Sequence, residues 1–305
     1  MIRPARLHLG DTIGVIAPAG PPNLEKLKQA IPFFERMGLH VKLGKHIDKV
    51  HGYLAGTDEE RLEDMHEMIA DTLVKAIIFA RGGYGTARIA ADLDYALLEN
   101  NPKIIWGYSD ITYLHTAIRQ KCGLVTFHGP MLASDIAKED FDALSAVMFK
   151  QLFEPTRLIY SEKISSLQVL VGGRAEGELV GGNLSLLVSS IGTPNAIETK
   201  GKILMLEDIG EEPYRVDGML NQLRRAGKLS DAAGIVIGDF AEAQATLEES
   251  LTLEQVFRDY FCPLEIPVMS GFKIGHCFPH FAVPLGARAT LTTADKTLMI
   301  EPGVD

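Results

Sequence analysis

Apolar runs alternate with amphipathic segments along the first 150 residues. Thr12–Ala17 (TIGVIA) is a continuous apolar run that ends at proline and glycine, which is typical of a strand buried in a parallel sheet. Asn23 precedes a stretch whose apolar residues recur at helical spacing as far as Met37, so the pattern predicts a capped helix. The alternation continues with expected strands at Leu39–Leu43, Val74–Ala80, Lys103–Tyr108 and Leu124–Phe127, and with expected helices that begin at Thr57 and Asp110. This spacing predicts a parallel sheet covered on both faces.

The pattern changes in the middle of the chain. Between Phe153 and Gly173 short apolar stretches alternate with polar residues and no helix is evident, so we place a linker at residues 156–172. Beyond it, short strands mix with helices and glycine turns, which predicts a smaller α+β domain. The expected division is therefore residues 1–155, the linker at 156–172, and a second domain over residues 173–305. The expected strands there are 176–180, 202–206, 234–240, 289–293 and 297–300, and the expected helices are 184–191, 216–226 and 253–261.

Composition narrows the class of protein. The 305 residues are 46% hydrophobic and 23% charged, as in ordinary globular proteins. The net charge of −10 argues against binding nucleic acid or an anionic membrane through the whole surface. No apolar stretch approaches the ~20 residues of a membrane span. The run Ile13–Ala19 after Arg3 and Arg6 is shorter than a usual signal core, and the three cysteines cannot all pair, so we expect a cytoplasmic protein.

Ser109 is the most informative position for chemistry. It follows the expected strand Lys103–Tyr108 and precedes the expected helix from Asp110, so its side chain would lie at a sharp strand-to-helix turn. Such a turn can expose a nucleophile, and the free N–H groups of the helix start can bind an oxyanion. The local sequence lacks the second glycine of G-x-S-x-G, and a serine here can equally be a helix cap.

A glycine-rich segment, Arg81–Gly85 (RGGYG), follows the expected strand Val74–Ala80. Glycines let the backbone approach a ligand closely, so these N–H groups can bind a carbonyl oxyanion or a phosphate. The segment matches neither a Walker loop nor G-x-G-x-x-G, and a tight turn without a ligand remains open.

The second half offers a carboxylate and an imidazole. Leu206–Glu212 (LEDIGEE) places four carboxylates at the end of an apolar strand, where they could hold a divalent cation, orient a histidine or simply be solvated. Glu207 is expected to be the first residue after that strand. His276 suits a general base, although a lone histidine in a loop can also be polar surface. The spacing His276-Cys277-x-x-His280 has no matching Cys/His pair elsewhere, which argues against a structural zinc site. Serine, glutamate and histidine in this chain order, with two possible oxyanion donors, suit acyl transfer.

These segments together resemble the L,D-carboxypeptidase family of serine peptidases, the muramoyltetrapeptide carboxypeptidases. The resemblance spans about residues 13–286 in consistent order, with one departure, Gly218, where the family more often has arginine. The matching segments are RGGYG (81–85), GYSDIT (107–112), GGNL (181–184), LEDIGEEPY (206–214), and Gly275–His276 with Pro284–Gly286.

The resemblance implies a Rossmann-like parallel-sheet N-terminal domain and a smaller, β-rich C-terminal domain, with an active site that spans both. It implies Ser109 as nucleophile, His276 as general base and Glu207 as the carboxylate that orients the imidazole. The backbone N–H groups of Gly83 and Asp110 would form the oxyanion hole. Substrate-binding roles are expected for Arg81, Gly82, Tyr84, Asn183 and Arg215.

The implied reaction is removal of the terminal D-alanine from murein tetrapeptides, at the diaminopimelyl-D-alanine bond, during cell-wall recycling. The family also implies a cytoplasmic homodimer without metal or cofactor, and we expect neither nucleic acid nor membrane as a partner. One alternative is a peptidase of the microcin-C-resistance type, which cleaves aminoacyl-nucleotide antibiotics. That type uses active-site tryptophans, and the one tryptophan here, Trp106, falls in an apolar strand. Another is a non-catalytic two-domain protein that binds a small molecule.

Overall fold

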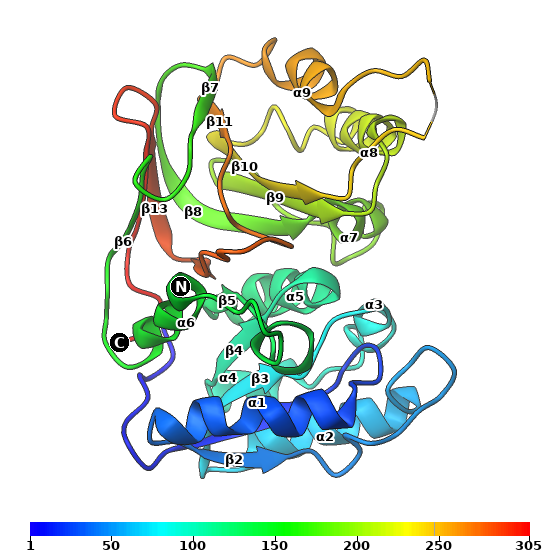
Figure 1. Cartoon of the computed structure of the whole chain (residues 1–305), viewed down its shortest axis with the longest axis vertical. Coiled ribbons are helices and arrows are strands. Elements are labelled where there is room, and N and C mark those ends of the chain that lie inside the picture. The colour runs from blue at the N-terminus through cyan, green and yellow to red at the C-terminus, as the bar shows by residue number, and fades with distance from the viewer. Residues whose placement is uncertain (247) are drawn as a thin grey trace. The chain divides into compact units, whose positions relative to one another are not determined.

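The computed structural model describes residues 1–246 and 248–305 and divides into two compact units (Figure 1). Two short C-terminal segments belong with the first unit, whereas the sequence pattern assigns them to the second domain. Short strands within residues 157–172, which the sequence pattern assigns to a linker, pair into the sheet of the second unit. The first unit comprises Met1–Thr156, Ala282–Leu285 and Pro302–Asp305, and the second Arg157–Phe281 and Gly286–Glu301.

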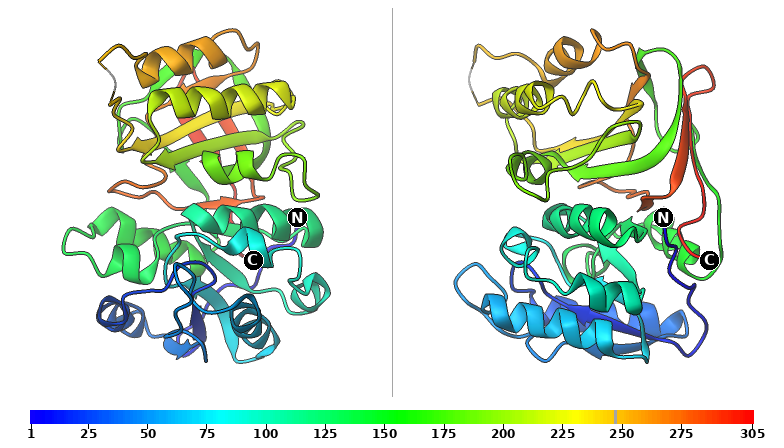
Figure 2. Two further views of the ribbon diagram at one scale, coloured as in Figure 1. Left: turned by 90° about the vertical axis from the view of Figure 1, so that its right-hand side faces the viewer. Right: turned by 180° about the vertical axis from the view of Figure 1, so that it is seen from behind.

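The first unit is built on a sheet with strand order β12-β5-β4-β3-β1-β2, in which β12 pairs antiparallel and the other neighbours are parallel. Because parallel crossovers are right-handed, α1 covers one face and α2 to α5 the other, as Figure 2 shows. The strands are β1 Thr12–Ile16, β2 His40–Leu43, β3 Val74–Phe79, β4 Ile104–Gly107, β5 Thr126–His128 and β12 Val283–Leu285. The helices are α1 Leu24–Arg36, α2 Asp58–Ala70, α3 Thr86–Ile89, α4 Tyr95–Asn100, α5 Thr112–Cys122 and α6 Ala143–Val147, with shorter turns at Ser109–Ile111, Leu132–Ile136 and Met148–Leu152.

Local sequence signals set the helix ends in this unit. The Asn23 side chain accepts a hydrogen bond from the backbone N–H of Lys26 and so caps α1. Thr57 and Glu60 form a reciprocal capping box at the start of α2. Gly123, with φ of 61°, ends α5 in the left-handed conformation. The expected strands and long helices of this half are confirmed.

The second unit contains a larger, curled sheet with strand order β6-β14-β13-β8-β9-β10-β11-β7. Strands β8 to β11 are parallel, and antiparallel strands extend the sheet on both sides. Helices α7, α8 and α9 pack on one face over an apolar core (Figure 1). The strands are β6 Leu158–Tyr160, β7 Gln168–Val171, β8 Arg174–Asn183, β9 Ile203–Ile209, β10 Gly234–Ala241, β11 Val268–Ser270, β13 Arg288–Thr292 and β14 Thr297–Ile300, and the helices are α7 Leu184–Ser189, α8 Pro213–Arg225 and α9 Leu253–Phe261.

Two strands are longer than the apolar pattern indicates. β8 continues to Asn183 and β9 to Ile209, and the two pair in parallel with Asn183 opposite Glu207. Glu207 therefore lies inside β9 and not after its end, which corrects the sequence expectation. Polar residues extend these strands because their side chains find partners within the unit. The α/β class, with a doubly covered parallel sheet and a β-rich second part, is confirmed. Among the described residues, no helix is long and apolar enough to cross a membrane.

Candidate active site

Ser109 lies at an abrupt change of backbone direction in the first unit. β4 ends at Gly107, and Ser109 opens a single 3₁₀ turn that runs directly into α5. Its φ is 64°, a left-handed conformation that residues other than glycine adopt uncommonly. Strained residues of this kind cluster at functional sites, where the surrounding structure holds them in place. The structure confirms the strand-to-helix turn that the sequence predicts.

The glycine-rich segment packs directly against the Ser109 side chain. A Cβ atom placed on Gly82 would lie 3.0 Å from Ser109 Cβ and 3.2 Å from its Oγ, so glycine is what allows the approach. The adjacent Gly83 has φ of 124°, and a Cβ there would lie 3.1 Å from the backbone nitrogen of Gly20. The backbone N–H of Gly20 donates to the carbonyl of Gly82 over 3.2 Å. Backbone groups of this segment are therefore fixed beside the serine.

Asp110 ties the Ser109 turn to the end of the glycine-rich segment. Its buried carboxylate accepts a hydrogen bond from the backbone N–H of Thr86 over 2.8 Å, and the Thr86 hydroxyl donates to the backbone carbonyl of Asp110 over 2.5 Å. Burial raises the pKa of the Asp110 carboxyl, while the hydrogen bonds from Thr86 oppose that rise. The Asp110 side chain thus holds the turn that carries its own backbone N–H, which the family resemblance implies to be an oxyanion donor.

Arg61 is a further residue at this site, and the sequence pattern did not indicate it. The residue is 1% exposed, and one guanidinium nitrogen donates to the carbonyls of Pro18, at 2.5 Å, and Gly85, at 3.0 Å. Its other terminal nitrogen pairs with Asp58. The available signal was its position one helical turn before Met65 on the buried face of α2.

Arg81 and Tyr84, two residues of the glycine-rich segment that are predicted to bind substrate, differ in burial and in their contacts. The Arg81 guanidinium donates to the carbonyls of Gly82, at 3.2 Å, and Pro21, at 3.3 Å, so two of its three nitrogens have backbone partners. Tyr84 is 53% exposed, and its ring lies edge-on to that of Tyr53 with 5.6 Å between centroids. Their contacts with substrate stay predictions.

The second unit brings together the predicted carboxylate and imidazole. His276 Nδ1 lies 2.7 Å from Glu207 Oε2, a short, charge-assisted contact. The Glu207 side chain is fully buried in β9, whereas His276 lies in the loop after β11 and is 13% exposed. A carboxylate at Nδ1 fixes the orientation of an imidazole and stabilises its protonated form.

Glycines make the space for the Glu207 carboxylate. A Cβ on Gly275, whose φ is 124°, would lie 2.7 Å from Glu207 Oε2 and 2.9 Å from its Cβ. A Cβ on Gly238 would lie 2.4 Å from the carbonyl oxygen of Ile274 and 3.2 Å from Glu207 Cβ. The strand and the histidine loop can therefore approach as closely as the contact requires.

The other carboxylates of the acidic run have separate partners. Asp208 accepts hydrogen bonds from the Asn183 side chain and from the backbone and hydroxyl of Ser185, all within 2.9 Å. Glu212 accepts from the backbone and hydroxyl of Thr246. Within the described residues, no three His, Cys, Asp or Glu side chains gather closely enough to hold a metal ion. Of the readings that the sequence left open for this run, the geometry supports the one in which it orients a histidine.

Asn183 and Arg215, both predicted to bind substrate, contact neighbouring residues of the second unit in this structure. Asn183 is 3% exposed and caps α7, because its side-chain oxygen accepts from the backbone N–H of Leu186. Arg215 is exposed on α8, 3.8 Å from Glu211 and within hydrogen-bond distance of the Tyr214 hydroxyl. Gly218 is the departure from the family pattern. A Cβ added to it would have no atom within 4 Å, so a side chain there would meet open space.

In the first unit, a serine at a strained strand-to-helix turn beside a glycine-rich backbone is an arrangement that can expose a nucleophile. In the second unit, a buried carboxylate on an imidazole is an arrangement that can orient a general base. Residues 13–129 match the LD-carboxypeptidase N-terminal domain and residues 176–291 the LD-carboxypeptidase C-terminal domain. The chain belongs to this family of serine peptidases, and it is a hydrolase of the carboxypeptidase class.

The chain is similar to known proteins over nearly its whole length. The chain is 57% identical over 303 residues to the probable murein peptide carboxypeptidase of Bacillus subtilis strain 168, covering 99% of this chain and 95% of that protein. The muramoyltetrapeptide carboxypeptidase structure from Oxalobacter formigenes has 34% identity and a TM-score of 0.85, covering 95% of this chain and 97% of the other. The microcin C7 self immunity protein MccF, in complex with aspartyl sulfamoyl adenosine, has 25% identity and a TM-score of 0.90, covering 99% and 98%.

Proposed function

We propose that the protein is a serine L,D-carboxypeptidase that removes the terminal D-alanine from murein tetrapeptides, at the diaminopimelyl-D-alanine bond. The observation that carries the chemistry is the left-handed Ser109 turn packed against Gly82. The murein substrate is supported by the 57% identical Bacillus subtilis relative, named as a probable murein peptide carboxypeptidase.

In the proposed mechanism, Ser109, His276 and Glu207 act as one triad. Ser109 Oγ attacks the carbonyl carbon of the diaminopimelyl residue while His276 takes the hydroxyl proton. Glu207 holds Nδ1, so Nε2 is the ring nitrogen that exchanges this proton. The proton then passes to the departing amine of D-alanine, and water, activated by the same imidazole, hydrolyses the acyl-enzyme and regenerates Ser109.

The proposed oxyanion donors are the backbone N–H groups of Gly83 and Asp110. The Thr86–Asp110 hydrogen bonds and the Arg61 contact with the Gly85 carbonyl support this assignment, because they fix the backbone on both sides of the serine. A donor of this kind contributes ~3 kcal/mol to transition-state stabilisation in comparable sites.

The decisive experiment incubates the protein with L-Ala-D-Glu-meso-diaminopimelyl-D-Ala and measures released D-alanine. We expect release by the wild type, none above background by Ser109→Ala, and no effect of a chelator. His276→Ala alone should lower release about as much as Ser109→Ala does, because residues that act as a unit are non-additive. Equal release by wild type and Ser109→Ala would refute the nucleophile, and loss with chelator would indicate metal-dependent hydrolysis.

The structural likeness to MccF suggests aspartyl sulfamoyl adenosine as a second substrate to compare with the tetrapeptide. Aspartyl sulfamoyl adenosine should be cleaved more slowly than the tetrapeptide, and faster cleavage would favour the microcin-resistance type. A cytoplasmic location and a homodimer stay predictions, to be checked by cell fractionation and by the solution mass.

A further inference from the structure

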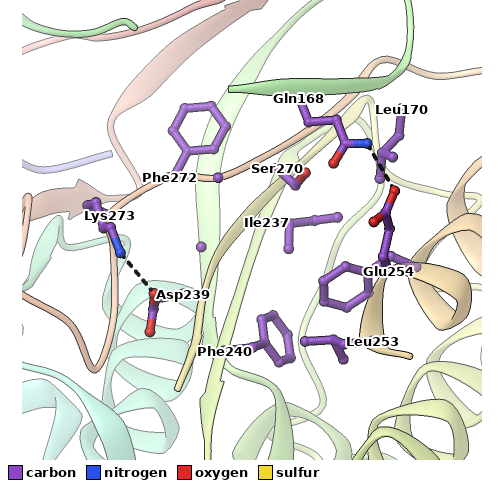
Figure 3. Close-up of a pocket in the computed structure, with 13 residues that line it drawn as sticks. Gln168, Leu170, Ile237, Asp239, Phe240, Leu253, Glu254, Ser270, Phe272 and Lys273 are labelled. Carbon is purple, nitrogen blue, oxygen red and sulfur yellow. Dashed lines mark hydrogen bonds and ion pairs between the residues drawn. The ribbon is translucent and has the colours of Figure 1, made fainter. Parts of the chain in front are cut away.

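The second unit contains a cavity of about 300 Å³ at the carboxyl ends of β10 and β11 (Figure 3). Phe240 in its lining packs against the core under α8 and α9, whereas the Lys273–Asp239 ion pair lies on the opposite face of β10. The charged and apolar groups of this cavity therefore do not form one surface for a small ligand. In the first unit, by contrast, the contacts of a buried carboxylate, Asp135, lead to the turn at Ser109.

Asp135 lies after β5 and is 3% exposed. Its Oδ1 accepts a hydrogen bond from the Tyr108 hydroxyl over 2.9 Å, and its Oδ2 accepts from the backbone N–H of Met131 and from the Ser134 hydroxyl, both over 2.9 Å. Lys138 Nζ is 3.8 Å from Oδ1, and its side chain is 46% exposed. A carboxylate is buried at low cost only where hydrogen bonds replace water, and these three donors do so. The buried charge therefore links Tyr108 to the segment after β5.

Tyr108 connects this carboxylate to the proposed nucleophile. It is 5% exposed and stands between Gly107, the last residue of β4, and Ser109. Its ring lies edge-on to that of His128, with 5.5 Å between centroids, and Asp135 holds its hydroxyl. Because the side chain is fixed at both ends, the peptide that leads into Ser109 has little freedom to rotate. A left-handed serine persists only where the surrounding structure holds it in this way.

The short turn that contains the carboxylate, Leu132–Ile136, also lies against the glycine-rich segment. Met131, directly before the turn, has its Cε 3.4 Å from the position of a Cβ on Gly82. The backbone N–H of Ala133 donates over 2.8 Å to the carbonyl of Ala80, the residue before that segment. The turn is a single π turn, a rare conformation that occurs frequently at functional sites. It therefore contacts the backbone on two sides of the serine.

We propose that Asp135 is a positioning residue for the nucleophile. Through the Tyr108 hydroxyl it holds the N-terminal side of the left-handed Ser109 turn, as Asp110 holds the C-terminal side through Thr86. The inference rests on the proposed function, because it assigns a second support to the proposed nucleophile. Asp135 acts through Tyr108, so its loss should lower kcat and leave KM nearly unchanged.

The test removes the link from either end and measures release of D-alanine from the tetrapeptide. Tyr108→Phe keeps the ring and loses the hydroxyl, so kcat should fall about tenfold with KM within a factor of two. Asp135→Ala removes the acceptor for three donors, and kcat should fall about 30-fold. Asp135→Asn should restore most of that loss, because its amide oxygen can accept from the Met131 N–H while its amino group donates to the phenol oxygen. In the Asp135→Ala background, Tyr108→Phe should have no further effect, because the phenol has already lost its partner.

A second readout depends on Ser109 and not on the tetrapeptide. Inactivation by diisopropyl fluorophosphate, in which the serine Oγ displaces fluoride, should slow by the same factors as kcat, with Ser109→Ala as the blank. Tyr95→Phe is the matched control, because the Tyr95 hydroxyl also donates within the first unit, to the carbonyl of Ala90. It should lower the urea midpoint and leave kcat and the inactivation rate within a factor of two. A purely structural role for Tyr108 would give this same pattern in Tyr108→Phe.

Wild-type kcat and inactivation rate in Tyr108→Phe, or additive losses in the double variant, would overturn the proposal. Tyr108→Phe keeps every acceptor in place, so it decides alone if Asp135→Ala does not fold. Inactivation at Ser109 without release of D-alanine would refute the proposed substrate, and the inactivation rates of the variants would then decide the positioning role. A wild type that neither releases D-alanine nor reacts at Ser109 would refute both proposals.

Discussion

The two proposed halves of the catalytic machinery are held in different ways. In the first unit Ser109 is positioned by backbone conformation: its own φ of 64°, the close packing of Gly82, and hydrogen bonds to the surrounding carbonyls and N–H groups. In the second unit His276 is positioned by one buried carboxylate, Glu207. The serine region should therefore be sensitive to any added atom, whereas the histidine region should be sensitive to the loss of one charge.

The largest effect after loss of the serine is expected for Glu207→Gln. The amide keeps the shape of the buried side chain but cannot stabilise a protonated imidazole, so kcat should fall on the order of 10³- to 10⁴-fold with KM little changed. Steady-state release of D-alanine measures both constants. Glu211→Gln, a half-buried carboxylate in the same acidic run, is the control and should stay within twofold of wild type. Near-normal kcat in Glu207→Gln would remove the carboxylate from the mechanism.

Gly82→Ala tests the serine region by adding one methyl group. Its Cβ would lie 3.0 Å from Ser109 Cβ and 3.2 Å from Oγ, which forces a shift of the serine or of the backbone beside it. A misplacement of this size should lower kcat about 10²-fold. Gly218→Ala is the matched control, because nothing lies within 4 Å of its Cβ position. If both alanine variants have wild-type turnover, backbone packing does not position Ser109.

The sequence predicts the fold well wherever apolar runs are long and capped. The α1 and α2 ends follow from Asn23, Thr57 and Glu60, because a capping side chain bonds only to N–H groups a few residues away. By contrast, β11 and β12 have three residues each and are defined by pairing with distant strands. A three-residue run carries no periodicity of its own.

The candidate site also contains a part that is encoded locally in the sequence and parts that depend on contacts between distant residues. The Ser109 turn is visible in the sequence because strand, serine and helix are contiguous. The Glu207–His276 contact joins residues 69 positions apart. The residue types alone left several roles open for each of them, and the family resemblance selected this pairing. The sequence does not predict the burial of Arg61, because a charged residue on a helix is ordinarily exposed to solvent. Its burial depends on the carbonyls of Pro18 and Gly85, which are distant in sequence and lie next to Arg61 only in the folded chain.

A smaller effect is expected for Arg61→Lys, which keeps the positive charge but not the planar group that reaches Pro18, Gly85 and Asp58 together. The glycine-rich segment should lose part of its support, and kcat should fall about tenfold with KM within a factor of two. Arg88→Lys is the control, since Arg88 also pairs with Asp58 but is exposed. If kcat falls equally in Arg61→Lys and Arg88→Lys, the effect comes from the shared contact with Asp58 and not from the hydrogen bonds to the carbonyls of Pro18 and Gly85.

The smallest effect on turnover, but a measurable one on stability, is expected for His115→Gln. His115 is buried in α5, with Nε2 2.8 Å from the carbonyl of Gly107, and burial lowers its pKa from 6.5 to about 3. Between these values the unfolded chain binds a proton that the folded chain excludes, so the free energy of unfolding falls as the pH drops from 6.5 towards 3. One proton contributes a slope of about 1.4 kcal/mol per pH unit.

Urea titrations at pH 7, 6, 5 and 4 measure that slope. His115→Gln removes the titrating group and should flatten the dependence, most clearly between pH 6 and pH 5, where most carboxyl groups remain ionised in both folded and unfolded chains. His8→Gln, at an exposed histidine, should keep the wild-type slope. Parallel curves for wild type and His115→Gln would mean that His115 titrates alike in both states. The strand end before Ser109 would then be accessible to water, and the rigidity ascribed to the serine region would not extend beyond the glycine-rich segment.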